Sequence, residues 1–262
     1  MEAAIKLDLT NRTALVCGAS QGIGAATAHE LADLGCKVII LARSQDKLDN
    51  VLSQLPGDGH QSLSHDLADR AGLESKVGAL LEGGPIHILV NNTAGPKPGP
   101  ISQVDEETFL GAFGNHLLVS SLLTRLLLPG MKEAGFGRII NIISTSVKVP
   151  IPHLGASNTI RGAVASWAKT LSIEVAPHGI TVNNVLPGFT RTPRLTSLIE
   201  NAAVKQGKSV PEIEAAWQSS VPANRFAEPT EVASAAAFLA SPAAGYINGI
   251  NVPVDGGRTG CL

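Results

Sequence analysis

The sequence predicts one doubly wound α/β domain, in which a parallel sheet is covered by helices on both faces. The chain has 262 residues, which suits one large domain at roughly 150 residues per domain. Short β-branched runs alternate with longer segments of helical period, as expected of βαβ units. The short runs are apolar almost throughout, which is typical of parallel strands buried on both faces. Right-handed crossovers then join them into one sheet.

Each element follows from this alternation. The strand runs are, in order, 13–17, 37–41, 86–90, 138–143, 180–186 and 250–254. The helical patterns occupy 22–34, 45–55, 68–82, 103–134, 153–176 and 229–240. The segment 189–222 is longer than an ordinary connection between a strand and a helix, and its helical pattern runs only from Pro211 to Trp217. We predict that this segment forms a substrate flap over the carboxyl edge of the sheet.

Composition limits the classes of partner. Hydrophobic residues make up 44% of the chain and charged residues only 16%, against a usual charged share of about 25%. We therefore expect an extensive core together with subunit interfaces, and predict a homo-oligomer, either a dimer or a tetramer. The net charge of −2 provides no positive field for nucleic acid or an anionic membrane. A small-molecule substrate is the expected partner.

The sequence carries no sign of a membrane segment or a metal site. No stretch reaches the roughly 18 uninterrupted apolar residues of a spanning helix, and the start MEAAIKLDLT has no apolar signal-peptide core. These features predict a soluble cytoplasmic protein. Cys17, Cys36 and Cys261 form no CxxC pair, which predicts reduced, buried thiols rather than disulfides or a zinc site.

A glycine-rich turn follows the first strand run, with the sequence CGASQGIG at 17–24 and an apolar helical pattern after it. Glycines let the backbone turn tightly and bring its N–H groups close to a pyrophosphate at the start of a helix. A plain strand-to-helix turn is the alternative, but the position in the first βα unit favours a dinucleotide site. The predicted contacts are Gly18, Ser20, Gln21, Gly22, Ile23 and Gly24.

The end of the second strand run indicates which dinucleotide is bound. An NAD-selective site usually places Asp or Glu there to bind the ribose 2′-hydroxyl, whereas this chain has Leu-Ala-Arg-Ser at 41–44. Arg43 and Ser44 suit a 2′-phosphate, although Arg43 can also be read as a solvated loop charge. NADP(H) is therefore the preferred cofactor, with NAD(H) as the alternative.

Besides the glycine turn CGASQGIG, four further motifs stand out: LVNNTAG at 89–95, PGFTRT at 187–192, RFAEP at 225–229 and VDGG at 254–257. Together these motifs resemble those of the short-chain dehydrogenase/reductase family, in particular its members similar to 3-oxoacyl-ACP reductases, whose turn TGxxxGIG has Thr where this chain has Cys17. The resemblance covers nearly the whole chain. It implies a single NAD(P)-binding Rossmann domain over residues 1–262, with a seven-stranded parallel sheet.

The resemblance also implies further cofactor contacts. His65-Asp66-Leu67 looks like the family's adenine-contacting Asp-Leu, and the PGxxxT motif holds the nicotinamide carboxamide in the family. The residues assigned in this way are Asp66, Leu67, Asn92, Thr93, Ala94, Pro187, Gly188, Thr190 and Thr192.

The active-site pattern departs from the family. Family members use Ser, Tyr and Lys in a Ser…YxxxK pattern, with a helix Asn that supports a proton relay. Ser144 and Asn115 match this pattern, but Ser157 stands at the Tyr position and Arg161 at the Lys position. Ser144 lies 13 residues before Ser157, the usual family spacing. These four residues are the catalytic candidates, with Arg161 also assigned to the cofactor, and the single tyrosine, Tyr246, is expected to be structural.

The two substitutions alter one coherent site, because positions four apart share a helix face. An aliphatic hydroxyl is a far weaker acid than a phenol with a pKa of about 10, so Ser157 can donate a hydrogen bond but is a poor proton source. Arg161 stays charged and can hold ribose hydroxyls. His153 and His116 are candidate replacement acids, since imidazole titrates at about pH 6.5. The other interpretation of each is a surface or capping histidine.

Three functions fit these observations. The leading one is an NADP(H)-dependent oxidoreductase that acts on a carbonyl, an alcohol or an imine by hydride transfer. An iminium substrate accepts hydride without a proton delivered to oxygen, so it suits a site without the phenol. The alternatives are a non-catalytic dinucleotide-binding subunit that partners a competent homologue, and a redox-neutral enzyme.

Overall fold

The computed structural model describes residues 6–261, so residues 1–5 and 262 of the predicted 1–262 domain lie outside the described part. Within that part the strands form one parallel seven-stranded sheet of order β3-β2-β1-β4-β5-β6-β7. The strands are β1 Thr13–Cys17, β2 Lys37–Ala42, β3 Gln61–Ser64, β4 Ile88–Asn91, β5 Gly137–Ile142, β6 Ile180–Pro187 and β7 Asn251–Val254. This arrangement confirms the predicted fold class.

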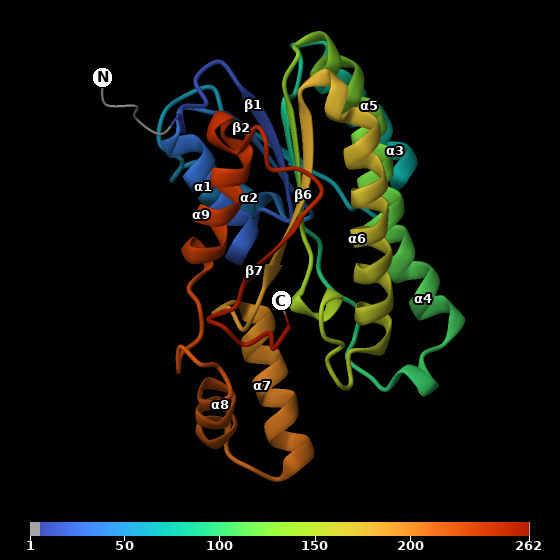
Figure 1. Cartoon of the computed structure of the whole chain (residues 1–262), viewed down its shortest axis with the longest axis vertical. Coiled ribbons are helices and arrows are strands. Elements are labelled where there is room, and N and C mark those ends of the chain that lie inside the picture. Colours follow the sequence, from blue (N-terminus) through green and yellow to red (C-terminus); the bar gives the residue numbers. More distant parts are fainter. Residues whose placement is uncertain (1–5, 262) are drawn as a thin grey trace.

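Helices cover both faces of the sheet (Figure 1). One layer consists of α1 Gly22–Asp33, α2 Gln45–Leu52 and α9 Pro229–Ala240; the other consists of α3 Arg70–Leu81, α4 Glu106–Phe113, α5 Val119–Glu133 and α6 Gly155–Val175. Successive side chains of a strand point to opposite faces, so Val16 and Val38 join the first core and Leu15 and Ile39 join the second. Burial on both faces explains why these strand runs are apolar throughout.

Two elements differ from the prediction for identifiable reasons. The apolar pattern does not predict β3, because its sequence QSLS is polar and the strand lies partly exposed at the edge of the sheet. The single helix expected over 103–134 is interrupted: a π-helical segment, Gly114–Leu118, separates α4 from α5. Such local widenings of a helix recur at functional sites.

A row of asparagines, buried in β4 to β6 and half-buried in β7, crosses four strands of the sheet. The side-chain amide of Asn91 donates to Asn141 at 2.9 Å, Asn141 donates to Asn184 at 2.8 Å, and Asn184 donates to Asn251 at 2.8 Å. Each pair is also a register pair between neighbouring strands. Because a slip of one residue would leave these buried amides unpaired, the row specifies the register of β4 to β7.

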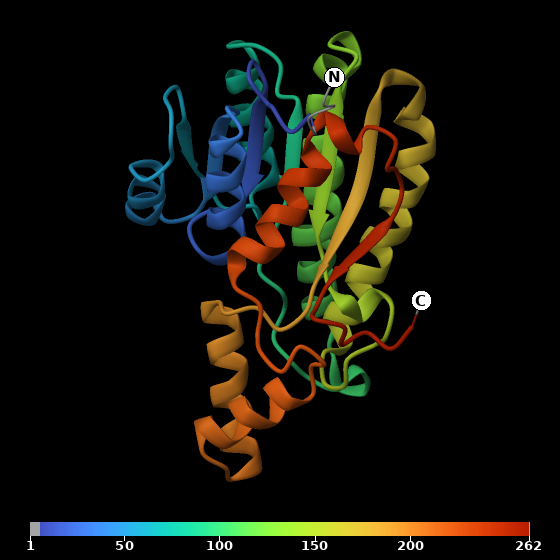
Figure 2. The same cartoon turned by 60° about the vertical axis from the view of Figure 1, so that its left-hand side comes forward.

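The segment 189–222 contains two helices, α7 Pro193–Gln206 and α8 Val210–Ser219, and not only the one predicted from Pro211. Both helices extend beyond the ends of the strands (Figure 2). α7 buries Leu195 and Ile199 against Ile213 of α8 in a small apolar cluster. The hydroxyl of Thr192 caps α7 by accepting the backbone N–H of Leu195, and Pro193 occupies the first position of the helix.

No helix among residues 6–261 is long and apolar enough to span a lipid bilayer. Cys17 and Cys36 are buried free thiols, as predicted, whereas Cys261 is exposed. The prediction of a buried thiol is therefore wrong at Cys261, because it follows the last strand and lies outside both helical layers.

Candidate active site

The glycine turn has the geometry of a close backbone approach. Gly18 and Gly22 have φ values of +61° and +59°, a left-handed conformation that strongly favours glycine. A Cβ atom at Gly18 would collide with the carbonyl of Asn92, and one at Gly24 would collide with the carbonyl of Gly18. The amide of Asn92 donates to the carbonyls of Cys17 and Gly18 at 3.3 and 3.2 Å, so Asn92 fixes the shape of the turn.

The turn leads directly into α1, whose N-cap residue Gln21 makes no side-chain capping bond. The N–H groups of the first turn are therefore available to an anion. Ser20 is half-buried, and Ile23 packs against the first core. The residues predicted to contact the dinucleotide from this turn therefore lie together at the start of α1.

Two cations follow β2, and one of them contacts this turn. Arg43 is exposed at the end of β2, and Ser44 caps α2 without a side-chain capping bond. The ammonium of Lys47 donates to the side chain of Gln21 at 3.3 Å, a proximity that the sequence analysis missed. The closeness of Lys47 in the sequence to Arg43, with Lys47 in the first turn of α2, was the available signal.

The residues after β3 lie farther along the same edge. Asp66 is exposed, and its carboxylate accepts a hydrogen bond from the backbone N–H of Ala68 at 3.0 Å. Leu67 packs against the second core. The Asp-Leu pair thus occupies a loop at the carboxyl end of an edge strand, and its contact with the adenine stays a prediction.

The predicted catalytic residues gather where β5 ends. Ser144 follows β5 by two residues, and its hydroxyl accepts the N–H of Ser146 at 3.1 Å. Ser157 and Arg161 lie one turn apart on α6, and Nε of Arg161 donates to Oγ of Ser157 at 3.3 Å. Nη1 of Arg161 donates to the carbonyl of Ile142, the last residue of β5, at 3.1 Å. Arg161 thereby links α6 to the end of β5.

The π-helical segment places Asn115 and His116 beside the loop after β4. Asn115 is half-buried. His116 is buried and hydrogen-bonded through Nδ1 to the hydroxyl of Thr93, next to the exposed Ala94. Burial, and then the charge of Arg161, lower the pKa of His116 to about 3. The surface or capping interpretation is thus wrong for His116, and a ring that stays neutral at physiological pH is a poor proton donor.

His153 lies outside the helix in which the sequence pattern places it. α6 begins at Gly155, and His153 is exposed with a φ of +63°. Its backbone carbonyl accepts the N–H of Gly99 at 2.7 Å. The surface interpretation therefore fits His153, because the preceding prolines delay the start of the helix.

The loop after β6 lies against the glycine turn. Pro187 ends β6. A Cβ atom at Gly188 would stand 2.7 Å from Cα of Asp255, so the PGFTRT motif also closely contacts the VDGG motif. Thr190 is buried, and the methyl group of Thr192 lies 3.1 Å from the position of a Cβ at Gly22. The first and the sixth strands therefore present their predicted contacts to the same side of the molecule.

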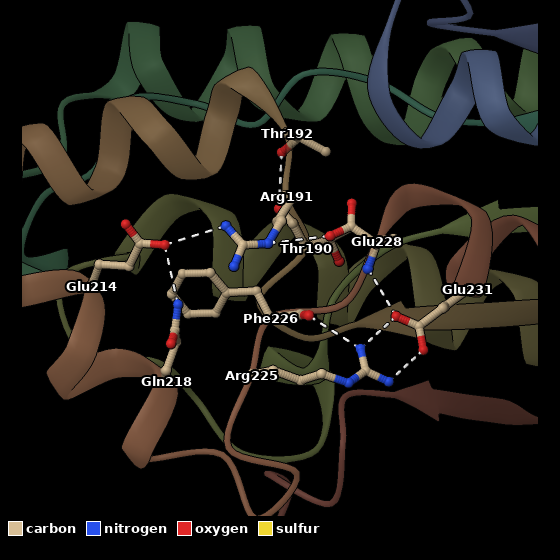
Figure 3. A network of polar contacts seen from close by, with 9 residues as sticks. All are labelled: Thr190, Arg191, Thr192, Glu214, Gln218, Arg225, Phe226, Glu228 and Glu231. Carbon is tan, nitrogen blue, oxygen red and sulfur yellow. Dashed lines mark hydrogen bonds and ion pairs between the residues drawn. The ribbon is translucent and has the colours of Figure 1, made fainter. Parts of the chain in front are cut away.

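A polar network fastens segment 189–222 to α9 (Figure 3). Arg191 pairs with Glu214 of α8 and with Glu228, the N-cap residue of α9, at 3.2 Å each. Arg225 forms a two-pronged pair with Glu231 at 2.6 and 2.7 Å. These groups lie at the surface, so their ion pairs add little to stability. Their effect is to position α8 relative to α9.

Comparison with known proteins identifies the family. Residues 18–259 match the family model described as Enoyl-(Acyl carrier protein) reductase. The chain belongs to the short-chain dehydrogenase/reductase family.

Members of this family from distant organisms match along almost their whole length. The NADPH-dependent reductase BacG of Bacillus subtilis is 34% identical over 256 residues, which is 95% of this chain and 98% of the relative. The 3-oxoacyl-[acyl-carrier-protein] reductase FabG of Vibrio cholerae is 34% identical over 254 residues, with 96% and 98% covered. The structure of L-sorbose reductase from Gluconobacter frateurii, complexed with NADPH and L-sorbose, has a TM-score of 0.91 at 28% identity, with 98% of this chain and 100% of that chain covered.

This short-chain dehydrogenase/reductase holds no tyrosine at the end of β5. Its single tyrosine, Tyr246, is fully exposed between α9 and β7. The sequence analysis did not assign Gly95 or Arg194 to the site. A Cβ atom at Gly95 would lie 3.6 Å from Nη2 of Arg161, 3.7 Å from Nη2 of Arg194 and 4.0 Å from Oγ of Ser157. The only signal for Arg194 was its place two residues after the PGFTRT motif.

Proposed function

We propose that this protein is an NADP(H)-dependent oxidoreductase that transfers hydride to or from a carbonyl, alcohol or imine substrate. The observation that carries the proposal is the joint position of the glycine turn and of the Ser157–Arg161 pair at the carboxyl ends of one parallel sheet, where open α/β folds bind ligands. The NADPH-dependent relatives support the choice of cofactor. The cytoplasmic location and the homo-oligomer stay predictions.

The residues of the turn fit a dinucleotide. Gly18 and Gly22 hold the turn in a left-handed conformation, Gly24 lets α1 approach it closely, and the uncapped start of α1 would provide N–H donors for a pyrophosphate. Arg43, together with Lys47, would pair with a 2′-phosphate. Bound NADPH supplies the hydride.

The chain's own groups would hold and polarise the acceptor. Because Nε of Arg161 donates into Oγ of Ser157, the hydroxyl proton of Ser157 is left to donate outward, and the nearby guanidinium favours developing negative charge. Ser144 uses its oxygen as an acceptor for Ser146 and can donate in the same way. Neither serine is a strong acid, so we propose that the final proton comes from water, or that the substrate is an iminium ion that needs none.

The first test measures cofactor binding and hydride transfer separately. Calorimetry should detect NADPH binding, and Arg43→Glu should weaken NADPH more than NADH, whereas Lys132→Glu, on the distant end of α5, should leave both unchanged. NADPH oxidation is then followed by its ultraviolet absorbance across ketones and imines. Folded protein that binds NADPH yet consumes none of these substrates would contradict the proposal.

The second test restores the family pattern. Ser157→Tyr combined with Arg161→Lys should raise the reduction of simple ketones, because a phenol then stands where the hydroxyl was. The expected gain is about 10²-fold or more, the usual contribution of a placed general acid. A double variant that folds, binds NADPH and shows no gain would place the divergence of the site elsewhere.

A non-catalytic subunit is the second candidate, and the exposed position of Tyr246 favours it. In that case the chain would bind NADPH without turnover, and activity would appear only on mixing with a homologue that retains YxxxK. We also propose that segment 189–222 is the substrate flap, since it lies beyond the carboxyl ends of the strands (Figure 2).

A further inference from the structure

The turn that follows β7, residues 255–259, contacts both ends of segment 189–222. At the start of this segment, the PGFTRT motif lies against the turn. Just after its end, the N–H of Ala223 donates to the carbonyl of Gly256 at 3.1 Å. A Cβ atom at Gly256 would stand 2.8 Å from the side chain of Val221. The last turn of the chain thus lies at the base of the proposed flap.

Hydrogen bonds within this C-terminal turn fix its shape. The carboxylate of Asp255 accepts the N–H groups of Gly257 at 3.0 Å and Thr259 at 2.8 Å. Gly256 and Gly257 have φ values of +64° and +83°, a left-handed conformation that favours glycine. The backbone of Arg258 is therefore held in a defined position relative to β7.

The side chain of Arg258 lies over an aromatic stack that reaches α8. Its Cζ is 4.1 Å from the centroid of the Phe189 ring, within the range of a cation–π interaction. Phe189 is stacked on Trp217 of α8, with centroids 4.9 Å apart and ring planes 12° apart. Arg258, Phe189 and Trp217 therefore connect the C-terminal turn to α8.

The ring of Phe189 takes the place of an acidic partner for Arg258. Arg258 forms no ion pair within residues 6–261, whereas Arg191 and Arg225 pair with glutamates. Burial lowers the pKa of Arg258, against the opposing charge of Asp255, so the guanidinium has lost part of its contact with water. The aromatic face is the contact that compensates for this loss.

The flap has few other attachments to the body of the protein. Its apolar cluster is separate from the two cores that flank the sheet, and Phe189 and Trp217 form the partly buried edge of that cluster. The ion pair from Arg191 to Glu214 of α8 lies at the surface and adds little. The position of α8 is therefore sensitive to a contact made at the edge of the cluster.

We propose that Arg258 is a positioning residue that holds the flap in place for substrate binding. The inference rests on the proposed function, in which segment 189–222 is the substrate flap, and it gives the C-terminal turn a part in the same site. Without the guanidinium, Phe189 and Trp217 would shift and α8 would move with them. Substrate binding would weaken rather than the hydride step, because the stack contains none of the four catalytic candidates.

Hydrogen exchange followed by mass spectrometry tests the position of the flap directly. Arg258→Met keeps the length of the side chain and removes its charge. The amides of α8 should exchange about two- to fivefold faster, as expected for the loss of one cation–π contact, while those of α9 stay unchanged. Arg258→Lys should recover most of the protection, because it retains a cation.

A matched control removes the same kind of contact from the opposite edge of the sheet. Cζ of Arg12 also lies 4.1 Å from the centroid of a phenylalanine ring, that of Phe136, and Arg12 precedes β1. Arg12→Met should leave exchange in α8 unchanged.

Steady-state kinetics with the ketone or imine that the parent reduces fastest measures the effect on the reaction. Arg258→Met should raise KM by about two- to fivefold and leave kcat nearly unchanged. Arg12→Met should change neither constant.

The outcomes separate this inference from the proposed function. Faster exchange confined to the flap, in a protein that consumes none of the ketones and imines, would retain the positioning role and reject the oxidoreductase. Unchanged exchange in α8, or an equal rise in α9, would overturn the role of Arg258. A fall in kcat with an unchanged KM would also overturn it, as would weaker NADPH binding with an unchanged KM for the substrate.

Discussion

The buried charge of Arg161 leads to an unusual prediction, that removing it stabilises the protein. The variant is Arg161→Met, which keeps the length and helix propensity of the side chain and deletes the guanidinium. Arg161 is 9% exposed and has no carboxylate partner within residues 6–261. Folding therefore buries this charge at the cost of its solvation free energy.

Two opposing contributions determine the size of the effect. Burial, with a smaller contribution from Arg194, lowers the pKa of Arg161 from 12.5 to about 10. A cation whose pKa falls on folding destabilises the native state at any pH below the folded value, and the penalty disappears as the pH rises from the folded toward the unfolded value. At 1.36 kcal/mol per pKa unit this penalty is about 3 kcal/mol. The variant also leaves the buried carbonyl of Ile142 unpaired, which costs about 1–3 kcal/mol.

The net gain is about 1 kcal/mol at pH 7, which corresponds to a rise of about 2–4 °C in the thermal midpoint for a chain of this size. Differential scanning calorimetry at constant protein concentration measures it. Arg125→Met is the control, because Arg125 is exposed on α5 and pairs with Glu74; its stability should stay within about 0.5 kcal/mol of the parent. A fall of several degrees for Arg161→Met would refute the reasoning that the charge is unsatisfied.

Three further predictions concern other parts of the fold. Gly18→Ala, at a φ of +61°, should destabilise the chain by about 2 kcal/mol or more. Gly78→Ala in α3, where a Cβ meets nothing within 4 Å, should add about 0.5–1 kcal/mol of stability. Equal melting temperatures of the two variants would contradict this. Because the pKa of His116 falls to about 3 on folding, the unfolded chain takes the proton first and stability should drop by up to about 1.4 kcal/mol per pH unit as the pH falls below about 6.5. His116→Gln should flatten that acid slope in urea titrations, and an unchanged slope would reject the assignment. A thiol reagent should label Cys261 quickly in the native protein and leave the two buried thiols, whose pKa values rise to about 12, unreacted until denaturant is added; fast labelling of a second thiol would contradict their burial.

The ion pairs around Arg191 position helices while adding little to the stability of the fold. Their members lie at the surface, so the ion pairs to Glu214 and Glu228 add little free energy. They nevertheless join the loop after β6 to both α8 and α9 (Figure 3). The second position of α7, which carries Arg194, follows Arg191 by three residues. The network is thus part of what holds Arg194 near Gly95.

The sequence by itself was sufficient for six strands of the parallel sheet, most helices and the glycine turn. These depend on local signals: the period of apolar residues along a segment and the need for glycine at a left-handed φ, as at Gly18 and Gly22. The replacement of the family tyrosine by Ser157 was visible in the same way, as a departure from a pattern of fixed spacing.

Only the tertiary structure decided which charges meet and which are buried. Arg161 and Arg194 lie on different helices and approach each other because the first turn of α7 lies against the loop after β4. His116 reads as a surface residue in the sequence and is buried because a π-helical turn directs it to Thr93. The pairing of side chains from distant segments depends on how the layers pack, and no local period encodes that distance.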